Sequence, residues 1–250
     1  MSELGAPTVS DVDLTGQALV GMSPGLHGVL AVPAGEGPWP AVVMVHEAFG
    51  LTDVMKRQVE RMAASGFLVL MPDLFVDGGP RKCLRATFAA ITSGRGRVWI
   101  DVEAARSYLV GREDCTGRVG VLGFCMGGGF ALVAAADRGF DVASVNYGRL
   151  PRDLDDALTG ACPIVGSYGG RDNSLRGAAA KLDAALEARG IPHDVKEYPS
   201  AGHSFLNDAP TGPAALRPLM KAILGAGPEP EAAADAWARI DDFFRLHLAD

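Results

Sequence analysis

The segment Val119–Phe130 constrains the fold of this chain more than any other. Its sequence, VGVLGFCMGGGF, runs from an apolar stretch of strand character through Gly-x-Cys-x-Gly-Gly into a helix of small and apolar residues. A sharp turn between a strand and a helix strains its central residue and requires small residues two positions before and after it. Gly123 and Gly127 meet that requirement around Cys125. The segment therefore predicts a buried strand, a nucleophile elbow at Cys125 and a helix.

The rest of the chain alternates short apolar runs with longer segments of helical period, which is typical of parallel strands covered by helices on both faces. We expect strands at Leu26–Val32, Ala41–His46, Phe67–Met71, Val119–Leu122, Val142–Asn146, Pro163–Ser167 and Asp194–Tyr198, with an antiparallel edge strand near Gly16–Val20. We expect helices at Asp53–Ala64, Val98–Val110, Gly128–Ala136, Ser174–Ala188 and Asp235–Leu248. The predicted fold class is α/β, with a mostly parallel central sheet flanked by helices.

Two stretches lack a regular pattern. Asp77–Arg97 contains glycines and four arginines, and Asn207–Pro230 contains five prolines and three glycines. Neither resembles a linker between two cores, and loops of this length at the strand ends of an α/β sheet often cover a functional site. We expect irregular loops there, and we interpret residues 1–250 as a single domain.

Charge and cysteine content narrow the function classes. A formal net charge of -7 opposes binding to nucleic acid, and the sequence has no run of eighteen apolar residues and no signal-peptide pattern at its start. The four cysteines lack CxxC spacing, which argues against a metal site and a disulfide framework. We expect a cytoplasmic protein with a small-molecule partner, no membrane or nucleic-acid partner and no metal. The sequence leaves open whether it is a monomer or a homodimer.

Cys125 has two interpretations. It is either an ordinary buried thiol at a strand end or a nucleophile. A thiol ionises near pH 8.5, and more readily beside a histidine or at a helix N-terminus. The glycine frame around Cys125 favours the nucleophile, and the other three cysteines, which have no such frame, are interpreted as structural.

A nucleophile at such an elbow is followed in the chain by an acid and then a histidine, each after a later strand. Asp172 follows a predicted strand and a Gly-Gly turn, and His203 follows the next strand and a glycine. Asp172 could orient the imidazole or could instead cap the helix expected near Ser174, and the sequence alone leaves both open. His46 ends a strand but precedes the nucleophile, which is the wrong order for the base.

Two backbone N–H groups are needed to bind the oxyanion of a tetrahedral intermediate, one directly after the nucleophile and one from an earlier strand-to-helix loop. Met126 and Ala48 occupy those positions. Glu47 lies beside Ala48 at the same strand end, and a buried carboxylate there would be costly without a partner. We expect that partner to be either an arginine or the Cys125 thiol.

Four segments together resemble the dienelactone hydrolase family, in order and spacing, over nearly the whole chain. They are His46–Gly50, Gly123–Gly128, Gly169–Asp172 and Ala201–Phe205, with lesser similarities at Met71–Phe75 and Asn146–Gly148. The resemblance implies an α/β-hydrolase fold and a cofactor-free Cys–His–Asp hydrolase that acts on esters or lactones through a thioester. It also implies that Glu47 contacts the thiol and helps it ionise when substrate arrives.

One departure from the family concerns the substrate. Dienelactone-processing members carry an arginine four residues after the histidine, as a partner for a substrate carboxylate, whereas this chain has Asn207 there. Arg81 and Arg85 could supply that partner or could be solvated loop charges. Tyr147 and Asn207 complete the expected substrate contacts.

Two alternatives to ester or lactone hydrolysis stay open at this point. The same scaffold could catalyse acyl transfer or carbon–halogen hydrolysis, because one fold hosts many reactions. A non-catalytic relative that binds a small molecule is the second alternative, and the complete set of triad residues argues against it.

Overall fold

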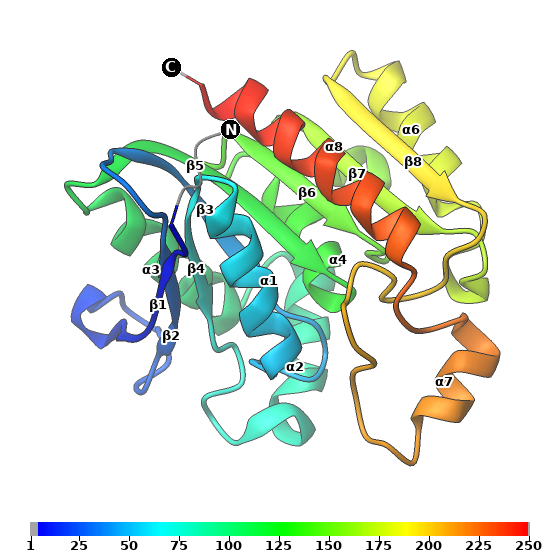
Figure 1. Cartoon of the computed structure of the whole chain (residues 1–250), viewed down its shortest axis with the longest axis horizontal. Coiled ribbons are helices and arrows are strands. Elements are labelled where there is room, and N and C mark those ends of the chain that lie inside the picture. The colour runs from blue at the N-terminus through cyan, green and yellow to red at the C-terminus, as the bar shows by residue number, and fades with distance from the viewer. Residues whose placement is uncertain (1–4, 250) are drawn as a thin grey trace.

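An eight-stranded sheet forms the centre of the computed structural model, which describes residues 5–249 apart from the side chain of Arg81. The strand order is β1-β2-β4-β3-β5-β6-β7-β8. The strands are β1 (Thr8–Asp13), β2 (His27–Val32), β3 (Trp39–Val45), β4 (Leu68–Pro72), β5 (Cys115–Phe124), β6 (Val142–Asn146), β7 (Ile164–Gly169) and β8 (His193–Tyr198). Strands β3 to β8 pair in parallel, and β2 joins β4 and β1 antiparallel (Figure 1). The predicted mostly parallel sheet is confirmed.

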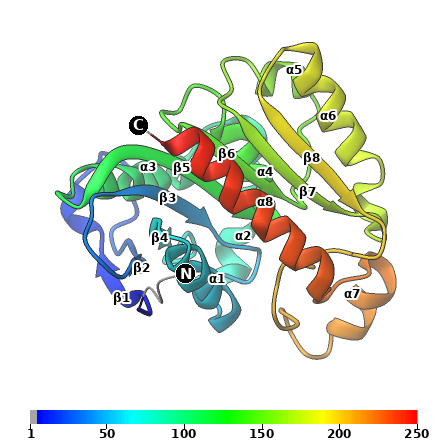
Figure 2. The same ribbon diagram turned by 45° about the horizontal axis from the view of Figure 1, so that its top comes forward.

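Helices cover both faces of the sheet. Figure 1 shows α1 and α8 in front of the strands and α3 and α4 behind them. The helices are α1 (Asp53–Ala64), α2 (Gly79–Ser93), α3 (Arg97–Val110), α4 (Met126–Ala134), α5 (Leu154–Ala157), α6 (Ala178–Ala188), α7 (Arg217–Leu224) and α8 (Pro230–Leu248). Figure 2 shows α8 lying across the sheet, with α7 beyond one end of it. This layering is the one expected for a parallel sheet whose strands are buried on both faces.

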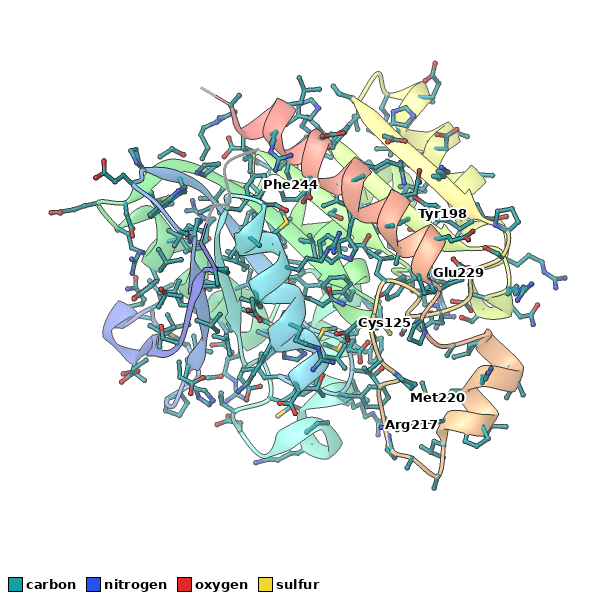
Figure 3. All side chains as sticks on the ribbon, in the orientation of Figure 1. Cys125, Tyr198, Arg217, Met220, Glu229 and Phe244 are labelled. Carbon is teal, nitrogen blue, oxygen red and sulfur yellow. The ribbon has the colours of Figure 1, made fainter. Side chains whose placement is uncertain are left out.

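The last helix shows how the sequence pattern becomes packing. Trp237, Ile240, Phe244 and Leu248 are at most 2 % exposed, so the predicted apolar face of α8 is its buried face. A Cβ added at Gly120 on β5 would lie 2.6 Å from the Phe244 ring, so the glycine makes room for that ring. Figure 3 shows Phe244 on α8. The packing holds α8 against the strand that carries the elbow.

The expected edge strand near Gly16–Val20 is wrong. Residues 15–17 form a short 3-10 turn, and the edge strand is β1, which ends at Asp13. The Asp13 carboxylate accepts hydrogen bonds from the backbone N–H and the hydroxyl of Thr15, at 2.8 Å and 2.7 Å. This side-chain turn competes with the strand and ends it.

The prediction of two irregular stretches is also wrong in part, because each contains a helix. In the first, the glycines lie at or beyond the ends of α2, while Cys83, Thr87 and Ala90 are buried at helical spacing. In the second, α7 ends at Gly225 with φ 61°. Its apolar residues Leu219, Met220 and Ile223 recur at helical spacing, but none of them is buried, and the surrounding prolines and glycines favoured a loop.

Three predicted helices begin at least two residues away from the expected first residue. Helix α4 begins at Met126 rather than at residue 128, and α8 begins at Pro230 rather than at residue 235. Proline suits the first turn of a helix, and the Glu229 side chain caps α8 by accepting from the Ala232 N–H at 2.7 Å. Helix α6 begins only at Ala178, since Gly177 with φ 74° separates it from the 3-10 turn at Asn173–Leu175. Within residues 5–249, no helix is both long enough and apolar enough to span a membrane.

Candidate active site

Cys125 sits at the junction of β5 and α4 with a strained backbone. Its φ of 54° and ψ of -112° lie in a region that residues other than glycine rarely adopt. The Cys125 N–H donates to the Asn146 carbonyl at 3.0 Å, and its carbonyl accepts from the Gly129 N–H at 3.1 Å. Figure 3 shows Cys125 close to the end of β5. The predicted elbow geometry is therefore present.

The glycines around Cys125 allow backbone to touch backbone. A Cβ added at Gly123 would lie 1.9 Å from the Gly127 carbonyl oxygen, and one added at Gly127 would lie 2.2 Å from the Val45 carbonyl oxygen. Both distances are far below any real carbon–oxygen contact. The turn consequently requires glycine at both positions, which is the packing that the sequence predicted.

His203 and Asp172 meet at the carboxyl end of the sheet. The His203 Nδ1 lies 2.5 Å from the Asp172 Oδ2, and the two side chains are nearly buried. Asp172 also accepts from the Ser174 N–H at 3.0 Å and from the Ser174 hydroxyl at 2.6 Å. The two interpretations left open for Asp172 both hold, since one oxygen caps the 3-10 turn and the other pairs with the imidazole.

The charges around His203 and Asp172 shift the pKa values of both side chains. Burial disfavours the charge on His203, but the negative charge of the neighbouring Cys125 and the hydrogen bond to Asp172 raise the pKa of His203 to about 10. Burial also opposes the charge on Asp172, yet the hydrogen bonds from His203 and Ser174 lower the pKa of that carboxyl. The favoured state of this pair is therefore an imidazolium hydrogen-bonded to the Asp172 carboxylate.

Glu47 is buried just after the end of β3, and among the described side chains its hydrogen-bond partner is an amide. Its Oε2 accepts from the Asn207 Nδ2 at 3.2 Å, and the Thr211 side chain lies beside the carboxylate. Among the side chains that the structure describes, no arginine or lysine pairs with it. Burial raises the pKa of Glu47, and the neighbouring side chains of Thr211 and Asn207 offset part of that rise. Thr211 lies in a stretch without pattern, so no sequence signal pointed to it.

Tyr147 completes a polar cluster beside the thiol. Its ring centroid lies 5.1 Å from that of His203. Burial, with the charges of Glu47 and Cys125, raises the pKa of the phenol well above its ordinary value. In the part of the chain that the structure describes, the Tyr147 hydroxyl, one carboxylate oxygen of Glu47 and the Asn207 amide oxygen are buried without a hydrogen-bond partner. These three atoms are available to a ligand.

The two expected oxyanion donors belong to the elbow and to the loop after β3. Met126 is the first residue of α4, and Ala48 follows Glu47 at the end of β3. Neither N–H donates to a backbone carbonyl or a side chain of the described residues. Both are therefore free to donate to a substrate oxygen.

Of the two candidate arginines, only Arg85 has a side chain that the structure describes. Arg85 is exposed on α2 and forms no ion pair among the described residues, and the side chain of Arg81 lies outside the described part of the structure. A small groove beside the site is lined by residues of the loop after β8 and of α7, Ser204, Thr211, Arg217 and Met220 among them. Figure 3 shows Arg217 and Met220 at α7. Across residues 5–249, no group of three or more His, Cys, Asp or Glu side chains could hold a metal ion.

The sequence of this chain is similar to those of known proteins. The model of the dienelactone hydrolase family matches residues 26–248. A protein of Methylorubrum extorquens named "Putative carboxymethylenebutenolidase" is 30% identical over 253 residues, which cover 94% of this chain and 81% of that protein. The expected membership is confirmed at this level of similarity.

Solved structures share the fold. A dienelactone hydrolase-like promiscuous phosphotriesterase from metagenomic libraries superposes with a TM-score of 0.74 at 23% identity, covering 98% of this chain and 100% of the other. A dienelactone hydrolase from Anabaena variabilis superposes with a TM-score of 0.68 at 22% identity, with the same coverage. The α/β-hydrolase fold predicted from the sequence is confirmed.

Proposed function

Because this chain belongs to the dienelactone hydrolase family, whose members hydrolyse esters and lactones, we propose that it does so without a cofactor through Cys125, His203 and Asp172. One observation carries the proposal. The strained Cys125 at the elbow lies beside an imidazole whose other nitrogen is held 2.5 Å from the Asp172 carboxylate. This is the connected order of nucleophile, base and orienting acid that covalent catalysis requires.

The proposed reaction has two halves. The Cys125 thiolate attacks the carbonyl carbon, and the N–H groups of Ala48 and Met126 bind the oxyanion. The intermediate collapses, the carbon–oxygen bond to the leaving group breaks, and His203 gives that oxygen its proton. His203 then takes a proton from water, the hydroxide attacks the thioester, and Cys125 leaves as a thiolate with the acid as product.

Glu47 has a supporting role in this proposal. Burial raises the pKa of its carboxyl, which makes the carboxylate a better acceptor for a proton from a neighbouring thiol. Its free oxygen lies in the cluster with Tyr147, beside Cys125. We assign Glu47 the role of receiving the thiol proton when substrate arrives.

The polar cluster favours an uncharged substrate group. Glu47 is hydrogen-bonded to the neutral amide of Asn207, and among the described side chains no arginine or lysine pairs with it. A substrate carboxylate placed there would face the Glu47 carboxylate without an arginine or lysine as its partner, and buried like charges repel strongly. We propose neutral esters or lactones as the substrates, with Tyr147 and Asn207 contacting them.

The cellular setting is part of the same proposal. All four cysteines are free thiols, as in proteins of reducing compartments, and the net charge of -7 disfavours nucleic acid as a partner. We therefore place the reaction in the cytoplasm, with a small molecule as the only partner that the proposal requires.

Turnover of p-nitrophenyl esters by single variants tests the proposal. Cys125→Ala and His203→Ala should lose turnover while the folded state, followed by circular dichroism, is kept. Cys162→Ala, which removes a thiol outside the site, is the matched control and should keep it. Wild-type turnover in either site variant would refute the proposal. Two other results would favour the alternatives. A trapped Cys125 adduct that is a thioether instead of a thioester by mass spectrometry would favour carbon–halogen hydrolysis. Esters or lactones that stabilise the fold without giving any product would favour a binding protein.

A further inference from the structure

His46 is a buried histidine that the proposed reaction does not use. It is 0 % exposed, and it lies between the last residue of β3 and the Glu47–Ala48 pair. Its Nδ1 lies 2.7 Å from the Glu47 carbonyl oxygen, and its Nε2 accepts a hydrogen bond from the Leu74 N–H at 3.1 Å. A carbonyl can only accept, so Nδ1 carries the proton and Nε2 does not.

Both ring nitrogens are therefore occupied by backbone groups, and the imidazole is neutral. Burial lowers the pKa of His46, which agrees with that state. The ring also packs edge-on against Phe75, with centroids 4.7 Å apart. These contacts fix the ring from two sides, because Leu74 and Phe75 belong to the loop after β4 and Glu47 belongs to the loop after β3.

The carbonyl that His46 holds belongs to the same peptide unit as the Ala48 N–H. A trans peptide is planar, and its C=O and N–H point in opposite directions. Fixing the Glu47 oxygen therefore fixes the direction of the Ala48 N–H. The Gly50 N–H donates to the same oxygen at 3.1 Å, so the carbonyl accepts two hydrogen bonds. Two donors on the oxygen also polarise the peptide and strengthen its N–H as a donor.

We propose that His46 is a positioning residue that aims the Ala48 N–H at the oxyanion. The inference rests on the proposed function, in which Ala48 donates to the tetrahedral intermediate. His46 touches neither substrate nor thiol, and it acts only through the peptide between Glu47 and Ala48. Its effect should consequently appear in the chemical step and not in substrate binding.

Two substitutions of equal shape test this. His46→Asn places an amide N–H near the position of Nδ1, whereas His46→Leu has the same shape and no donor, and both lose the bond from Leu74. His46→Leu should lower kcat by about 10-fold to 100-fold with little change in KM, since removing a whole oxyanion donor costs about 100-fold to 1,000-fold. His46→Asn should restore most of that loss. Equal kcat values in the two variants would overturn the inference.

Alkylation of Cys125 by iodoacetamide supplies a second readout. The thiolate displaces iodide from carbon and no oxyanion forms, so the rate reports the thiol and not the donor geometry. Peptide mass spectrometry should show Cys125 alkylated in both variants within about threefold of the wild-type rate. A parallel loss of alkylation and hydrolysis in His46→Leu would mean that His46 supports the site as a whole, which contradicts the inference.

Folding and the proposed function are controlled separately. If His46→Leu does not fold, His46→Phe keeps the ring against Phe75 without a donor and takes its place, with the same expected loss. If neither folds, a kcat of His46→Asn more than about tenfold below wild type would by itself contradict the inference, and a smaller loss supports it. Turnover by Cys125→Ala in the same assay would overturn the proposed function instead, so the two failures are distinguishable.

Discussion

Replacing Asp172 with asparagine removes one negative charge from the buried pair with His203 and keeps the shape of the side chain. The carboxylate has two tasks, pairing with the imidazole and capping the turn at Ser174. An asparagine oxygen can still accept from the Ser174 N–H, because asparagine is as good a cap as aspartate. The variant should therefore fold, and its defect should lie in the histidine.

The size of that defect follows from the contact. A hydrogen bond to a charged group contributes about 1.5 to 3 kcal/mol, and about 1.4 kcal/mol corresponds to one pH unit. The carboxylate stabilises the imidazolium, so its loss favours the neutral ring and lowers the pKa of His203. From a value of about 10 in the wild type, the pKa of His203 should fall by roughly one to two pH units.

Two measurements check this shift. Nitrogen-15 NMR of the histidine side chains follows the protonation of His203 directly. The second measurement is the pH profile of kcat/KM for an ethyl ester, whose leaving alkoxide needs a proton. The fall of kcat/KM at high pH should occur at lower pH in Asp172→Asn than in the wild type. Ser174→Ala keeps the carboxylate and its pairing with the ring, so it is the matched control and should titrate like the wild type. A folded Asp172→Asn whose His203 titrates at the wild-type pH would refute the reasoning.

Three further predictions concern the elbow, the substrate and the core. Gly123→Ala would put a Cβ 1.9 Å from the Gly127 carbonyl oxygen, so the thermal unfolding temperature and turnover should both fall severely. A Cβ added at Gly16 meets no atom within 4 Å, so Gly16→Ala should change neither. Asn207→Arg adds a cation beside Glu47 and should raise, by about tenfold or more, the ratio of kcat/KM for a carboxylate-bearing lactone to that for a neutral one, and an unchanged ratio contradicts the role of this position. Phe244→Ala should lower the free energy of unfolding in urea by about 3 to 5 kcal/mol while the folded fraction keeps its kcat, and a loss of kcat at full folding would contradict that separation.

The strand pattern and the elbow could be predicted from the sequence because each depends on local rules. Apolar runs predicted the parallel strands, and the glycines on either side of Cys125 follow from backbone contacts that no Cβ permits. The positions of Asp172 and His203 followed from chain order, since each ends a loop after a later strand. The structure brings these two side chains together, 2.5 Å apart.

The remaining features depend on contacts between segments that are far apart in the chain. The partner of Glu47 is an amide 160 residues away, and nothing local distinguishes Asn207 from other polar residues of its loop. Helix α7 has apolar residues at helical spacing, but it is short and the prolines and glycines around it indicate a loop. His46 precedes the nucleophile in the chain, so the sequence excluded it as the base. Only the structure shows that its ring links two loops.

Mass spectrometry of the enzyme during turnover tests the central claim most directly. The enzyme is mixed with a slowly hydrolysed p-nitrophenyl ester, quenched in acid and digested, and the peptides are mapped for the added acyl group. We predict one acyl group on Cys125, labile to hydroxylamine and absent from Cys125→Ala. An acyl group on another residue, or turnover at the wild-type rate by Cys125→Ala, would contradict the account.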